Sequence, residues 1–206
     1  MQPRIGVLVF QRKMFAALIA VAAFAVQAAM VLPARAQTVL YNNGPDGNVG
    51  YYRVNFGAVT TNSFTLPRAA TITGVALTLY AVDDRNAPQR LKWTISTEAL
   101  GGRVMGEGSV HLTLLSNPYP TRFQFFAWEM SFAIPSLSLP AGTYYLQVQD
   151  AVTRWNTYSF WAQSSDGASQ AYYEPIGANG AGQVSQVSSE SFSLMGEWST
   201  GEPRKR

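Results

Sequence analysis

The segment Leu139–Gln149, LPAGTYYLQVQ, decides the fold class of this chain. After a Pro-Ala-Gly turn, apolar residues at 144, 146 and 148 alternate with residues at 145, 147 and 149 that can face water. A period of two places successive side chains on opposite faces of a strand. The segment therefore predicts a β-strand with one face on a core and the other face on solvent.

The same alternation recurs along the chain, at Leu91–Ser96, Val110–Leu114 and Ser191–Leu194. Further strands are expected at 38–42, 50–58, 60–66, 70–81, 121–134, 157–163 and 170–174. Clusters of Gly, Pro, Asn and Asp separate these segments and are typical of turns. The sequence therefore predicts an all-β, antiparallel, jelly-roll-like β-sandwich over 37–200 as a single domain, preceded by an N-terminal signal helix.

Two predicted strands change phase. Ile72 is out of step with the series that begins at Val75, and Gly74 lies between them, so we expect a β-bulge at Gly74. The phase also changes between Phe125 and Phe126. Either a bulge lies there, or the strand is covered on both faces; we favour a central strand between the core and an overlying loop.

Residues 1–36 have the pattern of a signal peptide. Basic residues precede a long apolar run, Met14–Leu32, and Ala34-Arg35-Ala36 provides a small-x-small cleavage site before Gln37. A permanent membrane anchor is the alternative, because the run is long enough to span a bilayer. We expect cleavage, and hence an extracellular or periplasmic protein without membrane attachment once the leader is removed.

The charge balance argues against a nucleic-acid partner. The leader holds four of the 15 Lys and Arg residues and no acidic residue, so 11 basic and 12 acidic residues remain, a net of −1. Three of those basic residues lie in the tail, residues 201–206. A nucleic-acid-binding face needs clustered basic residues, and the body of the chain has no such cluster.

Several segments resemble a known group of exported proteins. Asn62–Leu66, Ala70–Val75 and Leu91–Ser96 are similar to successive strands of the PEP-CTERM-type bacterial exoproteins, and Leu139–Leu146 and Glu190–Gly196 are similar to two later strands. The resemblance covers roughly residues 60–196 and implies a secreted sandwich without catalytic residues to carry over. Members with a sorting tag end in Pro-Glu-Pro, an apolar helix and a basic tail. Residues 201–206 have no such helix, so anchoring by that route is not expected.

The residues leave few catalytic or metal chemistries open. The chain has no Cys and one His, His111, which lies at an outward strand position. With one His and no Cys, only oxygen ligands are available for a metal, and these suit a structural Ca²⁺. The candidate ligands are Asp46, Asp83 and Asp84, and the alternative is that these residues lie in solvated turns. No other cofactor is expected. Among the carboxylates that a glycosidase would need, Glu129 is distinctive because it lies among aromatics.

Aromatic residues provide the remaining signal. Trp93, Trp128, Tyr144 and Phe192 are expected in the core by their phase. A second group is harder to place inside, and its candidate ligand-binding residues are Arg154, Trp155, Tyr158, Trp161 and Tyr173. Flat aromatic faces beside polar side chains suit stacking on sugar rings, whereas packing beneath the 177–189 loop is the alternative.

These observations favour a secreted, non-enzymatic β-sandwich protein that binds glycan, either polysaccharide or cell-surface matrix. A structural surface or biofilm component without a small ligand is the first alternative. A divergent glycoside-active enzyme is the second, and it requires two carboxylates that converge in a cleft.

Overall fold

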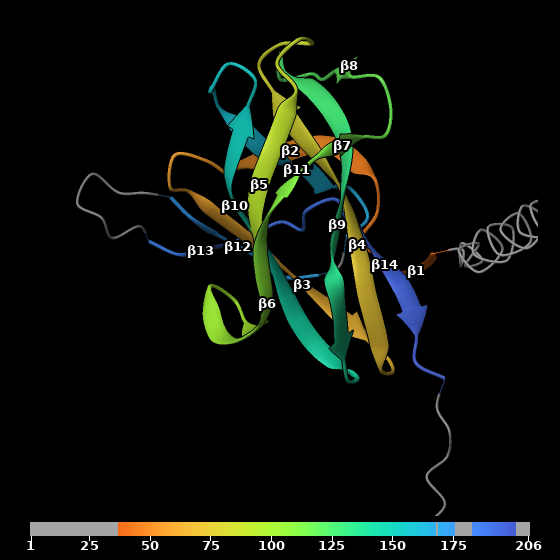
Figure 1. Cartoon of the computed structure of the whole chain (residues 1–206). Coiled ribbons are helices and arrows are strands. Elements are labelled where there is room, and N and C mark those ends of the chain that lie inside the picture. The colour runs from red at the N-terminus through yellow and green to blue at the C-terminus, as the bar shows by residue number, and fades with distance from the viewer. Residues whose placement is uncertain (1–36, 168, 176–182, 201–206) are drawn as a thin grey trace, which may run out of the picture. The chain divides into compact units, whose positions relative to one another are not determined.

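The computed structural model describes residues 37–167, 169–175 and 183–200, which form two antiparallel β-sheets packed face to face (Figure 1). The predicted β-sandwich is therefore confirmed. The predicted signal helix and the basic tail lie outside the described residues. Within the described residues, no helix is long and apolar enough to cross a membrane.

The first sheet contains eight of the strands in the described part of the chain. They are β1 (Thr38–Asn42), β2 (Asp46–Arg53), β4 (Ala70–Ala81), β7 (Thr113–Leu114), β8 (Tyr119–Pro120), β9 (Phe126–Leu139), β11 (Ser159–Ser164) and β14 (Phe192–Trp198). β4 is the central strand: β9 pairs along one side, whereas β14 and β11 share the other side. The sheet therefore forks beside β4 into a β14–β1 arm and a β11–β2 arm.

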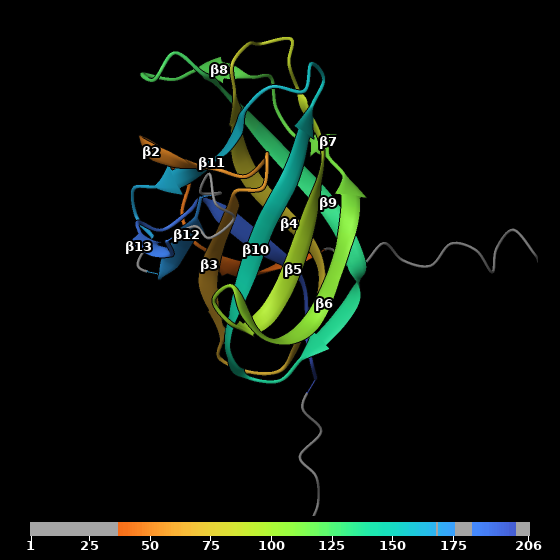
Figure 2. The same cartoon turned by 90° about the vertical axis from the view of Figure 1, so that its left-hand side faces the viewer.

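The second sheet contains the other six strands of the described residues. In spatial order they are β13 (Ser185–Val187), β12 (Ala171–Glu174), β3 (Val59–Leu66), β10 (Gly142–Thr153), β5 (Pro88–Glu98) and β6 (Gly101–His111). Figure 2 shows β3, β10, β5 and β6 in front of β4 and β14. β12 pairs only with residues 59–62 of β3, so residues 64–66 have β10 as their one strand neighbour among the described residues.

The alternation that predicted the strands also places the core. Leu146 and Val148 of β10 are fully buried between the sheets. The residues expected in the core by phase are all buried, and they are Trp93, Trp128, Tyr144 and Phe192. Burying side chains of this size supplies about 1.5–3 kcal/mol each, and this burial holds the sheets together without disulfides.

Both changes of phase have structural causes. Ile72 and Gly74 of β4 pair with the adjacent residues Gly196 and Met195 of β14, so β4 carries one extra residue there and the predicted bulge is confirmed. Ile72 and Val75 are both buried. The strand expected at 121–134 begins only at Phe126, because residues 121–125 form a turn closed by the Thr121 N–H donating to the Phe125 carbonyl.

That turn covers the outer face of the first sheet. Phe123 and Phe125 lie edge-on to Tyr51, at ring-centroid distances of 5.0 and 5.1 Å. Tyr80 and Ala127 are fully buried beneath them. The start of β9 is thus covered on both faces, as expected for this strand, although β4 rather than β9 is the central strand of the sheet.

Two further strand boundaries were predicted wrongly. The strand expected at 50–58 is β2, which begins at Asp46 and ends at Arg53, and the strand expected over 110–114 is interrupted. The alternation over 110–114 places Leu114 on the core face, but β6 ends at His111 and Leu114 is exposed in β7. β7 pairs with the edge of β9 instead, because the chain leaves the second sheet there and crosses to the first.

Candidate functional site

Three exposed aromatic side chains gather at one end of the sandwich, and we call this surface the aromatic end: Phe56, Trp155 and Tyr158. Their exposed fractions are 48%, 49% and 50%. The ring of Phe56 lies edge-on to that of Tyr158, with centroids 5.4 Å apart. Aromatic residues this large are normally buried, so three of them on two adjoining loops suggest a surface that another molecule covers.

Two buried asparagines hold the loop that carries Trp155 and Tyr158. The Asn86 side chain accepts from the Trp155 N–H (2.8 Å) and donates to the Thr157 hydroxyl. Asn55 donates to the Thr157 carbonyl (2.8 Å) and accepts from the Ser159 N–H. The loops 82–87 and 154–158 accordingly lie at the same end of the sandwich (Figure 1). A loop fixed in this way loses little conformational entropy on binding.

The backbone of the aromatic end is strained at Phe56. Its φ is +50°, in the left-handed region that bulky residues seldom adopt. Asn156, in the neighbouring loop, has φ +53°, which Asn tolerates better. Strain of this kind costs about 1–3 kcal/mol and tends to occur at functional sites. Here the strained residue carries one of the three exposed rings.

Two arginines add hydrogen-bond donors to the aromatic end. The Arg53 guanidinium lies 5.7 Å from the centroid of the Tyr158 ring. Its Nε is buried and has no hydrogen-bond partner. Arg154 is exposed in the same loop as Trp155. The surface therefore combines flat apolar faces with donors suited to the hydroxyls of a sugar.

The structure brings together three of the five predicted ligand-binding residues. Arg154, Trp155 and Tyr158 share the exposed loop. Trp161 is fully buried and its indole N–H donates to the Ser191 carbonyl (2.9 Å), so its inclusion in the site is corrected. Tyr173 is half-buried on β12, faces Tyr52 at 4.9 Å and lines a shallow hollow together with Arg53.

Sequence reasoning missed two residues of the aromatic end, Phe56 and Arg53. The only signal for Phe56 is its place between Asn55 and Gly57, two residue types that favour turns. Nothing in the sequence places these residues beside Tyr158, because that neighbourhood arises from the pairing of β2 with β11.

The predicted calcium ligands are engaged with the protein. The Asp83 carboxylate accepts from the Arg85 N–H (2.8 Å), and Asp84 lies 3.8 Å from the Arg85 guanidinium. Asp46 accepts from the Tyr80 hydroxyl (2.6 Å) and from the Asn48 N–H (2.7 Å). Within the described residues, no three acidic or His side chains come together as metal ligands.

Two carboxylates share a hollow of about 280 Å³ on the outer face of the first sheet: Asp46 and Glu129. Glu129 accepts from the Ser116 hydroxyl (2.7 Å). Tyr119 also lines the hollow; burial, followed by the negative charge of Asp46, raises its pKa to about 12. His111, the residue a catalytic triad would need, is exposed on β6 and does not line this hollow.

Polar side chains fill the fork between the two arms of the first sheet, and we call them the polar seam: Asn43, Asn62, Ser169, Ser189 and Glu190. Glu190 is fully buried. Its backbone N–H donates to the Asn62 side chain (2.7 Å), and its carbonyl accepts from Asn43. Neither carboxyl oxygen has a hydrogen-bond partner.

This burial has an electrostatic consequence. Loss of solvent raises the pKa of Glu190 well above its usual range, so the neutral acid is favoured in the folded protein. Burial also raises the pKa of Tyr52, and a negative charge on Glu190 would raise it further. Glu190 is therefore a buried acid at the junction of both sheets.

Comparisons with protein-family models and with curated proteins find no match for this chain. The candidate sites consequently depend on their own geometry.

Proposed function

We propose that this chain is an exported, non-enzymatic, jelly-roll-like β-sandwich protein that binds polysaccharide of the cell surface or extracellular matrix through the aromatic end. The apolar run and small-x-small site within residues 1–36 support export. The observation that carries the binding function is the exposure of Trp155 and Tyr158 on a loop fixed by buried Asn86 and Asn55.

The physical case for a glycan is one of shape and polarity. An exposed ring face suits the apolar C–H face of a sugar, and the guanidinium groups of Arg53 and Arg154 can donate to hydroxyl oxygens. A deep pocket is not needed for a long polymer, because several weak contacts add along its chain.

Sedimentation with insoluble polysaccharides, such as cellulose, chitin and peptidoglycan, tests the proposal. At least one should retain the wild-type protein, and Trp155→Ala should weaken binding about tenfold or more, as expected for loss of a central aromatic contact. Trp198→Ala is the control for loss of a tryptophan elsewhere, because Trp198 pairs with Ala70 at the opposite end of β4. Trp198 packs partly against the core, so the melting of this variant is measured as well.

Two outcomes separate the alternatives. If the polysaccharide retains both variants as well as it retains the wild type, the aromatic end does not bind it. If no polysaccharide retains the wild type, a structural surface component without a small ligand becomes the better-supported function. Trp155→Ala should also melt within a few degrees of the wild type, because its side chain is half exposed.

The carboxylate pair in the outer hollow favours a glycoside hydrolase as the second candidate. Asp46 and Glu129 face one hollow, as such a reaction requires. Release of reducing ends from a retained polysaccharide, abolished by Glu129→Gln, would establish hydrolysis and overturn the non-enzymatic proposal.

A further inference from the structure

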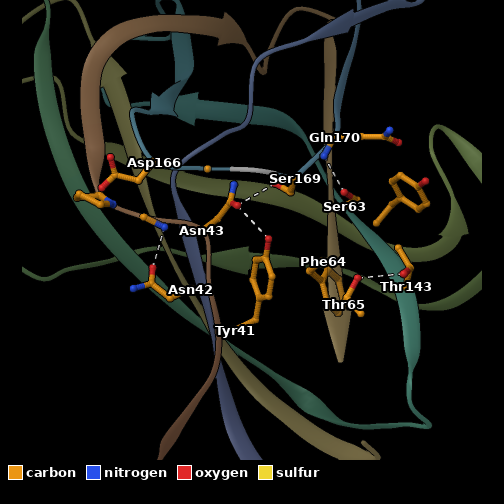
Figure 3. Close-up of a pocket in the computed structure, with 14 residues that line it drawn as sticks. Tyr41, Asn42, Asn43, Ser63, Phe64, Thr65, Thr143, Asp166, Ser169 and Gln170 are labelled. Carbon is orange, nitrogen blue, oxygen red and sulfur yellow. Dashed lines mark hydrogen bonds between the residues drawn. The ribbon is translucent and has the colours of Figure 1, made fainter. Parts of the chain in front are cut away.

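A second hollow lies away from the aromatic end. This groove has a volume of about 690 Å³ and opens between β1 of the first sheet and β3 and β10 of the second (Figure 3). Tyr41 forms one wall, whereas Thr65 and Thr143 form the other. The volume lies within the range of small-molecule sites, and no residue of the aromatic end lines the groove.

The lining of the groove selects one ligand chemistry. Hydroxyl and amide side chains predominate, and Asp166 is the one charged residue among the lining residues in the described part of the chain. Without a cationic side chain, the groove offers nothing to neutralise a phosphate, sulfate or carboxylate. Polar groups make up about half of the exposed lining, which disfavours a purely apolar lipid chain or peptide. A neutral, hydroxyl-rich molecule fits best.

The walls of the groove are held in place by their own hydrogen bonds. The Thr65 and Thr143 hydroxyls bond each other at 3.0 Å across β3 and β10. The buried Asn43 side chain accepts from the Tyr41 hydroxyl (2.9 Å) and from the Ser169 hydroxyl (2.8 Å), as Figure 3 shows. Asn43 belongs to the polar seam, so the floor of the groove is anchored to the fork of the first sheet.

The exposed part of the lining remains available to a ligand. Asp166 and Gln170 lie at the rim with exposed side chains, and Tyr145 presents a half-buried ring on the outer face of β10. Figure 3 shows Asp166 and Gln170 at opposite ends of the groove, so a carboxylate at one end and an amide at the other can bond the hydroxyls of successive units of a short saccharide.

We infer that this groove is a saccharide site that takes a short neutral saccharide and is separate from the aromatic end. The groove stands independently of the proposed function. If both sites bind glycan, one domain contacts two chains, or two parts of one chain, and gains avidity from the pair.

Titration by ¹H–¹⁵N NMR with single sugars tests the groove. The probes are methyl glucoside, methyl mannoside, galactose and N-acetylglucosamine, with glucuronic acid as the charged comparison, each at about 10 mM so that a dissociation constant of about 1 mM is detected. At least one neutral sugar should shift the backbone amides of Thr65 and Thr143. The variant Asp166→Ala/Gln170→Ala should weaken that binding about tenfold.

Two variants serve as controls. Asp84→Ala/Gln89→Ala removes the same residue types at exposed positions outside the groove and should bind as the wild type does. Trp155→Ala should also leave the Thr65 and Thr143 shifts unchanged, because Trp155 does not line the groove.

The possible results are distinct. Absence of groove shifts with every neutral sugar overturns the inference, while polysaccharide retention that depends on Trp155 would still support the proposed function. Tighter binding of glucuronic acid than of any neutral sugar overturns the assigned ligand chemistry. Groove shifts that survive Asp166→Ala/Gln170→Ala contradict the assigned residues.

Discussion

Replacement of Glu190 by Gln should remove a dependence of stability on pH. The side chain keeps its size but can no longer ionise. In the wild type, the folded state holds the proton to a higher pH than the unfolded chain, because the buried carboxyl has a pKa raised well above the usual value of 4.5. Between the unfolded pKa and the higher folded pKa, unfolding therefore releases a proton, and the free energy of unfolding falls as pH rises through this range.

The magnitude follows from the linkage of one proton. For each pH unit between the unfolded pKa and the folded pKa of Glu190, the wild type should lose about 1.4 kcal/mol relative to Glu190→Gln. Below about pH 4 the carboxyl is protonated in both states, so this contribution to stability is fully present and the two proteins should differ by about 1 kcal/mol or less.

Urea unfolding at closely spaced pH values from 4 to 8 measures this difference. Every other carboxylate is common to both proteins, so subtraction isolates Glu190. Glu107→Gln is the control, because Glu107 is exposed on β6, and its curve should run parallel to that of the wild type. Parallel curves for the wild type and Glu190→Gln would refute the account of a buried, unpaired acid.

Two further changes test the aromatic end and the close fit of β14 on β4 within the first sheet. Asn86→Ala should cost about 2 kcal/mol and weaken polysaccharide binding while Trp155 is still present, because the buried amide fixes the loop; unchanged melting and binding would show that the loop needs no anchor. Gly196→Ala should cost about 3 kcal/mol or more in urea unfolding, because an added Cβ would lie 2.0 Å from the Thr71 carbonyl oxygen. Gly101→Ala, with nothing closer than 4.0 Å to its added Cβ, should cost less than about 1 kcal/mol, and equal losses in the two variants would contradict the close packing of β14 on β4.

Local patterns were sufficient to predict the sandwich. Alternation located β10, and the loss of phase around Gly74 located a bulge, because side chains on a pleated strand must choose one of two faces. The same rule cannot say which face of a strand meets the core when both faces are apolar. Trp161 and Tyr158 are out of phase with each other, and only the packed structure shows that Trp161 is the buried one.

The buried acid had a signal in the sequence. Glu190 is in phase with Phe192 and Leu194, both buried, so the alternation points its side chain inward. Its lack of a partner was not predictable, because its neighbours Asn43 and Asn62 come from strands more than a hundred residues away.

The sites themselves depend on such long-range neighbours. The groove joins Tyr41 to Thr143 and Ser169, and the aromatic end joins Phe56 to Tyr158. The phase difference between Trp161 and Tyr158 indicated that one of the two faces outward, but the grouping of the exposed rings is set by strand pairing and loop anchoring.

The indole N–H signals of the five Trp residues test glycan binding most directly. The ligand is a soluble fragment of a polysaccharide that retains the protein, and the Trp155 signal is assigned through Trp155→Phe. The Trp155 signal should shift when the fragment binds. The Trp161 signal should stay fixed, because its indole N–H donates to the Ser191 carbonyl in the core. An unmoved Trp155 signal in protein saturated with the fragment would contradict the account.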